Sequence, residues 1–226
     1  ALVRHIAQAD AALRAGRWDR RRFLGTEVRG KTLGIVGYGH IGTQIGVLAE
    51  QLGMRIVFHD IETRLPLGNA VQLGSLDELL QASDVVTLHV PQTPATTWMI
   101  GAPQLRRMKR GSHLINASRG TVVVIEALAE ALHDGHLAGA AIDVFPVEPQ
   151  GNDARFESPL TPLDNVLLTP HIGGSTAEAQ ANIGREVAAK LIRYGANGST
   201  VSAVNFPQVS LPEHTGRCRL LHIHHN

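Results

Sequence analysis

The chain has 226 residues, which is enough for one large domain or for one domain and part of another. Apolar residues make up 43%, charged residues 18%, and the formal net charge is +1, so the composition is globular and does not favour nucleic acid or a membrane surface as a partner. No apolar run approaches the roughly 20 residues of a membrane span, and the single cysteine, Cys218, has no partner for an internal disulfide. We expect a cytoplasmic protein.

The first half of the chain alternates predicted helices and strands. Apolar positions at helical spacing predict a helix over 2–15, which Gly16 ends. A short apolar strand over 33–36 leads into a glycine-rich turn, a helix over 41–52 and a strand over 55–60. The pattern Ser75–Glu78 is typical of a capping box and predicts a short helix, which is followed by a strand over 85–90.

The alternation continues to the second capping-box pattern. A short helix is predicted near 103–109, a strand over 113–116, a helix over 125–133, and strands over 138–145 and 165–168. Ser175–Glu178 predicts the start of a long helix that ends near Tyr194. The segment 197–212 is polar and contains prolines, as a connector does, and 219–226 alternates like the beginning of a strand. We therefore interpret the chain as a piece of a longer protein.

The fold class follows from this order of elements. The predicted strands are nearly continuous apolar runs, which indicates that helices cover both faces of the sheet. The sequence therefore predicts an α/β fold with a doubly wound parallel sheet, of the Rossmann type, together with part of a second domain.

A dinucleotide fingerprint lies between the first predicted strand and its helix. Gly37, Gly39 and Gly42 match G-x-G-x-x-G: the first glycine allows a tight turn, the second allows close approach of a pyrophosphate, and the third allows the helix to pack on the strand. The next strand ends at Asp60, where a carboxylate would accept hydrogen bonds from ribose hydroxyls and repel a 2′-phosphate. NAD is therefore the expected cofactor, although Arg64 nearby weakens the preference over NADP.

Candidate reacting groups follow three later strands. Arg119 could bind a carboxylate in bidentate fashion, His171 could accept a hydroxyl proton, and Glu148 could orient the histidine ring. From spacing alone, the alternatives stay open: a surface ion-pairing arginine, a solvated loop acid, and one structural histidine among twelve.

Four motifs together resemble the D-isomer-specific 2-hydroxyacid dehydrogenases. They are Gly37-Tyr-Gly-His-Ile-Gly42, Asn116-Ala-Ser-Arg-Gly120, Asp143-Val-Phe-x-x-Glu148 and Pro170-His-Ile-Gly-Gly-Ser175, in the family's order. The resemblance covers roughly residues 1–206 and implies that Arg119, Glu148 and His171 are catalytic. It also implies that the following residues bind the cofactor: Gly37, Gly39, His40, Ile41, Gly42, Asp60, Ala117, Ser118, Arg119, Asp143, His171, Gly173 and Gly174.

A narrower resemblance, to the regulated bacterial branch that oxidises 3-phospho-D-glycerate with NAD, rests on 65–70 and 197–207. It implies an NAD-binding domain over 1–174, a return segment of the substrate domain over 175–206, and over 207–226 a linker and the first strand of an ACT-like regulatory domain. His224 and Asn226 would then help to bind the effector L-serine, and the enzyme would be a dimer or tetramer. The family usually has Asp or Asn in place of Val124, before a helix.

Three other interpretations stay open. The scaffold also suits a glyoxylate/hydroxypyruvate reductase or a D-lactate dehydrogenase, or a non-catalytic NAD-sensing binding protein, and this chain alone could be inactive. The alternation of His222 and His224 is compatible with a metal site, but no second cluster completes it, so no metal is expected.

Overall fold

The structure is a computed structural model that describes residues 1–149, 151, 155–204, 206–213, 215–216, 218–220 and 222. The chain forms two compact units, Ala1–His171 and Ile172–Asn226. The domain boundaries expected from the sequence stay a prediction.

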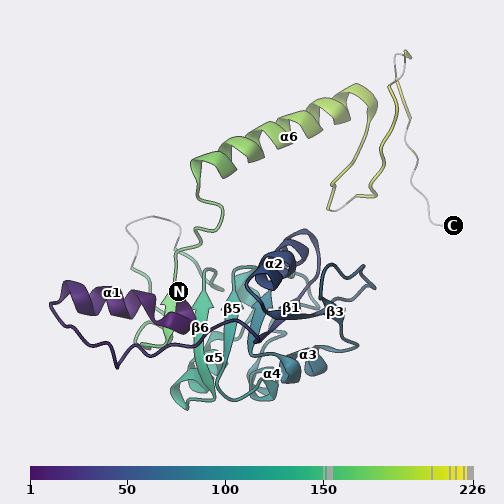
Figure 1. The fold of residues 1–226 in the computed structure, drawn as a ribbon. Helices are drawn as coiled ribbons and strands as arrows, with labels where there is room; N and C mark the ends of the chain where they lie inside the picture. Colours follow the sequence, from purple (N-terminus) through teal and green to yellow (C-terminus); the bar gives the residue numbers. More distant parts are fainter. Residues whose placement is uncertain are drawn as a thin grey trace. The chain divides into compact units, whose positions relative to one another are not determined.

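The first unit is built on a parallel sheet of seven strands, in the order β3-β2-β1-β4-β5-β6-β7 (Figure 1). The strands are β1 (Thr32–Val36), β2 (Arg55–His59), β3 (Val71–Gln72), β4 (Val85–Leu88), β5 (Ser112–Asn116), β6 (Leu137–Ile142) and β7 (Val166–Leu168). The order reverses between β1 and β4, and ligands of such sheets bind outside the carboxyl ends of the strands at this point.

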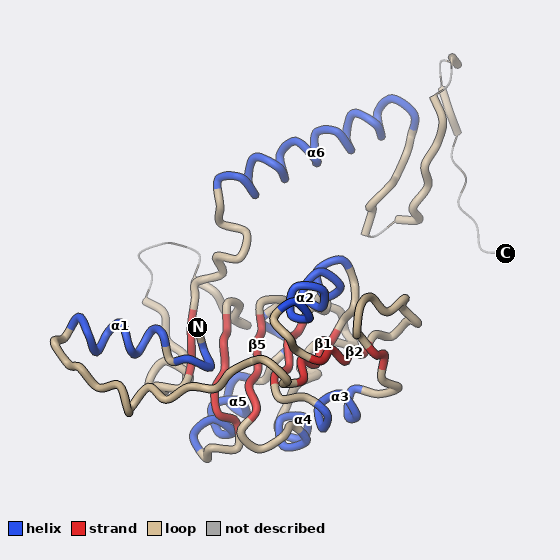
Figure 2. Tube along the Cα trace, viewed as in Figure 1, coloured by secondary structure: helices blue, strands red, loops and turns tan. Residues whose placement is uncertain are grey.

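Helices cover both faces of the sheet, as the apolar strands predict. In this unit they are η1 (Leu2–Arg4), α1 (Ile6–Arg14), α2 (His40–Gln51), α3 (Leu76–Ala82), α4 (Ala102–Arg107), η2 (Gly120–Val122) and α5 (Ile125–His133). Figures 1 and 2 show α2 on one side of the sheet and α3, α4 and α5 on the other. In β1, Leu33 and Ile35 belong to the core beneath α2, whereas Val36 belongs to the core beneath α3 to α5. The doubly wound α/β fold is therefore confirmed.

Several local predictions need correction. The helix expected over 2–15 is interrupted at His5, whose φ of 52° is left-handed, so a 3₁₀ turn precedes α1. The strand β3 and the turn η2 were not predicted. Ser75 caps α3 as expected, because its Oγ accepts a hydrogen bond from the Glu78 N–H. The second capping box is misplaced by one residue: Thr176, and not Ser175, caps the next helix through the Ala179 N–H.

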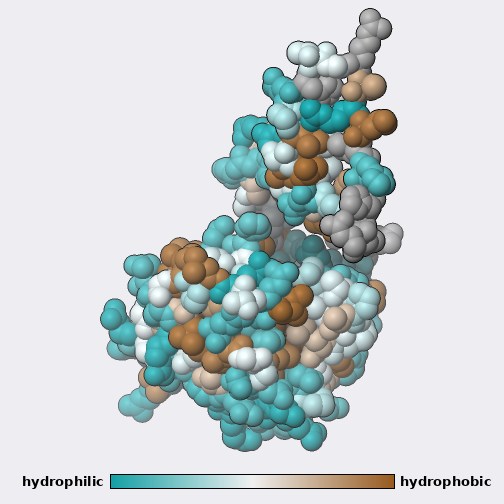
Figure 3. Space-filling model, turned by 90° about the vertical axis from the view of Figure 1, so that its right-hand side faces the viewer, coloured by the Kyte–Doolittle hydropathy of each residue, from teal (hydrophilic) through white to brown (hydrophobic). Residues whose placement is uncertain are grey.

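The second unit contains one long helix, α6 (Ala177–Asn197), which Gly198 ends with a φ of 77°. Several apolar side chains of α6 are exposed, and Figure 3 shows apolar surface in brown on this unit. The strand expected over 219–226 is not formed at 219–220 or at 222, and its other residues lie outside the described ones. None of the helices in the described ranges is long and apolar enough to span a membrane.

Candidate active site

The turn after β1 requires glycine at two of its positions. Gly37 has a φ of +90°, and a Cβ built on it would lie 2.7 Å from the carbonyl oxygen of His89. A Cβ on Gly42 would lie 2.1 Å from the carbonyl oxygen of Gly37. The first turn of α2 therefore packs directly against the loop, and a larger residue at either position would push them apart.

Gly39 leaves the approach to α2 open. It is the N-cap of the helix, no side chain caps it, and a Cβ built on it would meet no atom within 4 Å. The first N–H groups of an α-helix have no partner within the helix and carry a partial positive charge. His40 and Ile41 in this first turn are exposed. The geometry fits the pyrophosphate of a dinucleotide, for which the backbone N–H groups would be the donors.

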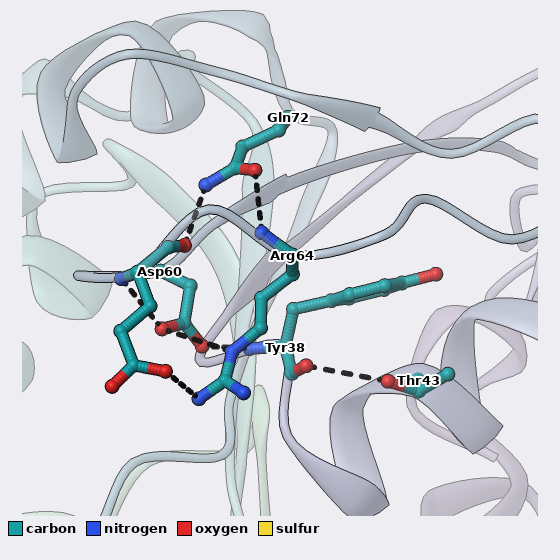
Figure 4. Close-up of polar contacts among 6 residues, drawn as sticks. Tyr38, Thr43, Asp60, Arg64 and Gln72 are labelled. Atoms are coloured by element: carbon teal, nitrogen blue, oxygen red, sulfur yellow. Dashed lines mark hydrogen bonds and ion pairs between the residues drawn. The ribbon is translucent and has the colours of Figure 1, made fainter.

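Asp60 lies beside this turn, directly after β2 (Figure 4). Its Oδ2 accepts a hydrogen bond of 2.8 Å from the Tyr38 N–H, and its Oδ1 accepts one of 3.0 Å from the Glu62 N–H. A carboxylate has about four acceptor positions; these two hydrogen bonds and the Arg64 Nε, which lies 3.6 Å from Oδ1, leave at least one for a ribose hydroxyl. The Tyr38 ring is buried and stacks on Phe58 at a centroid distance of 3.8 Å, so this ring belongs to the core.

The loop after β5 is fixed by a buried asparagine. Asn116 is 1% exposed; its Oδ1 accepts hydrogen bonds from the N–H and the hydroxyl of Ser118, and its Nδ2 donates to the carbonyl oxygen of Arg119. The side chains of Ala117 and Arg119 are exposed, whereas Ser118 is buried. The loop therefore presents the Arg119 guanidinium at the carboxyl edge of the sheet, while Ser118 serves to hold the loop.

Gly120 brings this loop against the one that follows β6. A Cβ on Gly120 would lie 2.0 Å from the carbonyl carbon and oxygen of Phe145, so only glycine permits the contact. The Phe145 N–H in turn donates a 3.0 Å hydrogen bond to Oε1 of Glu148. Arg119 and Glu148, which are distant in sequence, are thereby held in neighbouring loops.

Glu148 and His171 form a hydrogen-bonded pair. Oε2 of Glu148 lies 2.8 Å from Nδ1 of His171, and both side chains are partly exposed. Partial burial by itself raises the pKa of Glu148, but the hydrogen bonds from His171 and from the Phe145 N–H outweigh it and lower the pKa. An ionised carboxylate only accepts, so Nδ1 carries the proton of the neutral ring and Nε2 is left as the basic nitrogen.

The backbone of His171 is strained. Its φ of 53° is left-handed, a conformation that costs a non-glycine residue about 1 kcal/mol or more. Its N–H donates to the carbonyl oxygen of Thr169 at 3.1 Å. The pair and the arginine line one cavity of about 290 Å³, whose walls are Gln92, Arg119, Gly120, Thr121, Val144, Phe145, Pro146, Glu148 and His171. The structure thus brings together the predicted triad of residues.

The remaining predicted residues are placed unequally. Asp143 is half-buried after β6 and its Oδ1 accepts a hydrogen bond from the Thr169 hydroxyl at 2.5 Å. Gly173 and Gly174 belong to the second unit, so their contact with the cofactor stays a prediction. His224 and Asn226 lie outside the described residues. In the ranges that the structure describes, no group of three or more His, Cys, Asp or Glu side chains could hold a metal ion.

Sequence reasoning missed several members of this site. Gln92 lines the cavity but follows β4 in a loop without a motif that distinguishes it. The contact of Thr169 with Asp143 and the left-handed backbone of His171 cannot be recognised from the residue types. The bracing role of Asn116 could have been suspected, because an amide at the end of a buried strand must satisfy its hydrogen bonds.

The comparisons with known proteins identify the family of this chain. The family model described as "D-isomer specific 2-hydroxyacid dehydrogenase, NAD binding domain" matches residues 1–173. A D-3-phosphoglycerate dehydrogenase of Escherichia coli strain K12 is 63% identical over 225 residues, covering 100% of this chain and 55% of that protein. This chain therefore spans about half the length of the curated relatives that it matches.

Two solved structures share the fold. A glyoxylate reductase from Paecilomyes thermophila has a TM-score of 0.82 and 33% identity, over 90% of this chain and 61% of that chain. An acyclic imino acid reductase in complex with NADPH and D-Arg has a TM-score of 0.76 and 28% identity, over 86% of this chain and 61% of that chain. The predicted family and the predicted cofactor, NAD, are confirmed. The chain belongs to the D-isomer specific 2-hydroxyacid dehydrogenases, and residues 1–173 match their NAD-binding domain.

Proposed function

We propose that the full protein oxidises 3-phospho-D-glycerate to 3-phosphohydroxypyruvate, the first step of L-serine biosynthesis. The observation that supports a D-2-hydroxyacid oxidation most directly is the 2.8 Å pair of Glu148 and His171, which lines the same cavity as Arg119. The choice of 3-phosphoglycerate rests on the relatives with 60–63% identity, each of which is named D-3-phosphoglycerate dehydrogenase.

Three residues of the cavity, Arg119, Glu148 and His171, have distinct tasks in this proposal. The Arg119 guanidinium binds the substrate carboxylate and draws electron density from the adjacent C2 oxygen. Nε2 of His171 accepts the C2 hydroxyl proton, and Glu148 fixes the ring and stabilises the imidazolium that forms. NAD, when bound at the glycine turn, supplies the acceptor for the hydride that leaves C2. In the reverse direction His171 returns the proton.

The glycine turn and Asp60 would hold the cofactor. N–H groups of the first turn of α2 would donate to the pyrophosphate, and Asp60 would accept from the adenosine ribose. We place Ala117 and Asp143 beside the nicotinamide, as the family resemblance implies.

The proposal extends to regulation and assembly. The resemblance of the chain's end to an ACT domain supports L-serine as an effector, with His224 and Asn226 as contacts. We also propose a dimer or tetramer in the cytoplasm. A measurement of activity against L-serine concentration, with the subunit number taken from light scattering, tests both points.

The substrate is tested with the full-length protein. Steady-state NAD reduction is compared for 3-phosphoglycerate, D-lactate and glycerate, and NADH oxidation for glyoxylate and hydroxypyruvate. A clear preference of kcat/KM for 3-phosphoglycerate is expected. A preference for glyoxylate, hydroxypyruvate or lactate would contradict the proposed substrate but would still agree with the proposed hydride and proton transfer. Binding of NADH without turnover of any of them would favour an NAD-sensing binding protein.

A further inference from the structure

An acid–arginine cluster follows β2 at the position where the proposed adenosine ribose would lie. It consists of Asp60, Glu62 and Arg64, and Figure 4 labels Asp60 and Arg64. One terminal nitrogen of Arg64 lies 2.8 Å from Oε2 of Glu62, and its Nε lies 3.6 Å from Oδ1 of Asp60. The guanidinium is thus shared between two carboxylates.

The backbone under this cluster is held by Gln72 of β3. The Gln72 Oε1 accepts a 3.0 Å hydrogen bond from the Arg64 N–H, and its Nε2 donates a 2.9 Å hydrogen bond to the carbonyl oxygen of Glu62. Oδ1 of Asp60 accepts from the Glu62 N–H at 3.0 Å. The backbone that carries Glu62 and Arg64 is therefore held by both Asp60 and the strand β3.

The cluster contains an arginine that could bind a phosphate, but this arginine is paired with two carboxylates. An arginine near the carboxyl end of β2 is the usual partner of the NADP 2′-phosphate in this fold. Arg64 is 42% exposed in its side chain, so it is accessible, but its two acidic partners give the cluster a net charge of −1. The reductase solved with NADPH shows that the fold itself accepts a 2′-phosphate.

We propose that Glu62 is a specificity-determining residue that acts together with Asp60 to exclude NADP. Asp60 repels the 2′-phosphate directly, and Glu62 pairs with the Arg64 guanidinium, which would otherwise bind it. This inference rests on the proposed placement of the adenosine ribose beside Asp60. Removal of one acid leaves Arg64 paired with the other, so only removal of both turns the cluster into a receptor for a 2′-phosphate.

The test is a binding measurement on the full-length protein. Dissociation constants for NADH and NADPH are taken from nucleotide fluorescence, and those for ADP and 2′,5′-ADP from calorimetry, so that no turnover is needed. The variants are Asp60→Ser, Glu62→Gln, the double variant, and the double variant with Arg64→Leu. Glu62 is exposed, so its replacement should not disturb the packing. Asp60 accepts a hydrogen bond from the backbone, so Asp60→Asn, which keeps one acceptor oxygen, serves as a second and less disruptive replacement at that position.

The expected pattern is non-additive. The double variant gains NADPH and 2′,5′-ADP affinity by about tenfold or more over the product of the two single effects, since one charge-assisted hydrogen bond is worth at least about 1.4 kcal/mol. Arg64→Leu in the double variant abolishes the gain, whereas ADP affinity is unaffected by it. Two results would overturn the inference: no gain in the double variant, or a gain that persists without Arg64. Wild-type protein that binds no NADH would instead contradict the proposed function.

Discussion

His171 combines a left-handed backbone with a hydrogen bond to Glu148, and both features belong to the proposed proton transfer. The hydrogen bonds of its N–H to Thr169 and of its ring to Glu148 help to offset the strain, and the bond to Glu148 orients the ring. Because asparagine tolerates a positive φ better than other non-glycine residues, His171→Asn removes the base with the least disturbance of the backbone.

The lowered pKa of Glu148 predicts a pH dependence of stability. Its folded-state pKa lies below the ordinary value of 4.5, so the ionised group stabilises the fold above that value, and the stabilisation is lost as the pH falls through the folded-state pKa. Wild-type protein should therefore melt at a higher temperature than Glu148→Gln near neutral pH, and the difference should shrink as the pH falls below 4.5 and through the lower folded-state pKa. Melting curves from pH 3 to 8 check this. A difference that is independent of pH would contradict it.

Asn116 is predicted to act as a positioning residue for Arg119. Asn116→Asp replaces the donor to the Arg119 carbonyl oxygen with an acceptor, and the cost of about 1–3 kcal/mol predicts a loss of about fivefold or more in kcat/KM for the carboxylate substrate. The change in KM should exceed that in kcat, because carboxylate binding is what Arg119 supplies.

Asn165→Asp is the matched control for that variant. Asn165 is half-buried and also donates to a backbone oxygen. It lies directly before β7, at the amino ends of the strands, whereas Asn116 lies at a carboxyl end. Asn165→Asp should change stability but leave KM as in the wild type. Equal kinetic effects from both variants would assign Asn116 a structural role only.

At the scale of elements, the two glycines at the start of α2 are predicted to have different roles: Gly42 in folding and Gly39 in cofactor binding. Gly42→Ala places a Cβ 2.1 Å from a backbone oxygen and should destabilise the fold by about 1–3 kcal/mol. Gly39→Ala meets no atom and has ordinary backbone angles, so it should fold normally and bind NADH about tenfold or more weakly, since the methyl group occupies the proposed pyrophosphate position.

Melting temperature and NADH affinity are measured for both glycine variants. Unchanged NADH binding by Gly39→Ala would place the pyrophosphate elsewhere. A stable Gly42→Ala variant would show that α2 can shift away from the turn without cost.

The N-terminus of α5 offers a stabilising substitution. Val124 is the N-cap and its side chain makes no cap hydrogen bond. Val124→Asp should add about 1 kcal/mol of stability, because its carboxylate can accept from an unpaired N–H and lies favourably in the helix dipole. Ser75→Ala, which removes the existing cap of α3, should cost a similar amount. Urea unfolding measures both, and a neutral or destabilising Val124→Asp would contradict the prediction.

The elements also show which local signals are sufficient. The strand β1 is predictable because residues on both of its faces are apolar, and α3 because the spacing of Ser75 and Glu78 is that of a cap. The strand β3 has two residues, too few for any periodicity. At α6, Ser175 and Thr176 are both good N-cap residues, and Glu178 three residues after Ser175 favoured the wrong one.

At the scale of the whole molecule, the sheet order brings together what the sequence separates. The sequence predicted which residues would lie at the carboxyl ends of the strands. It also predicted that Glu148 would orient the ring of His171, which the 2.8 Å pair bears out. It could not predict the packing of Gly120 on Phe145, since this depends on how two loops meet in space. The matched relatives extend well beyond this chain, so the substrate preference has to be measured on the full protein.

The proposed oxidation of a D-2-hydroxyacid depends on His171 as the group that accepts the hydroxyl proton. The most direct test compares full-length wild-type protein with His171→Asn, measuring kcat/KM for 3-phosphoglycerate and the dissociation constant of NADH. We predict that kcat falls by roughly 10²-fold or more, as for loss of a general base, while the melting temperature stays close to that of the wild type. A folded variant that binds NADH and retains wild-type kcat would contradict this role of His171.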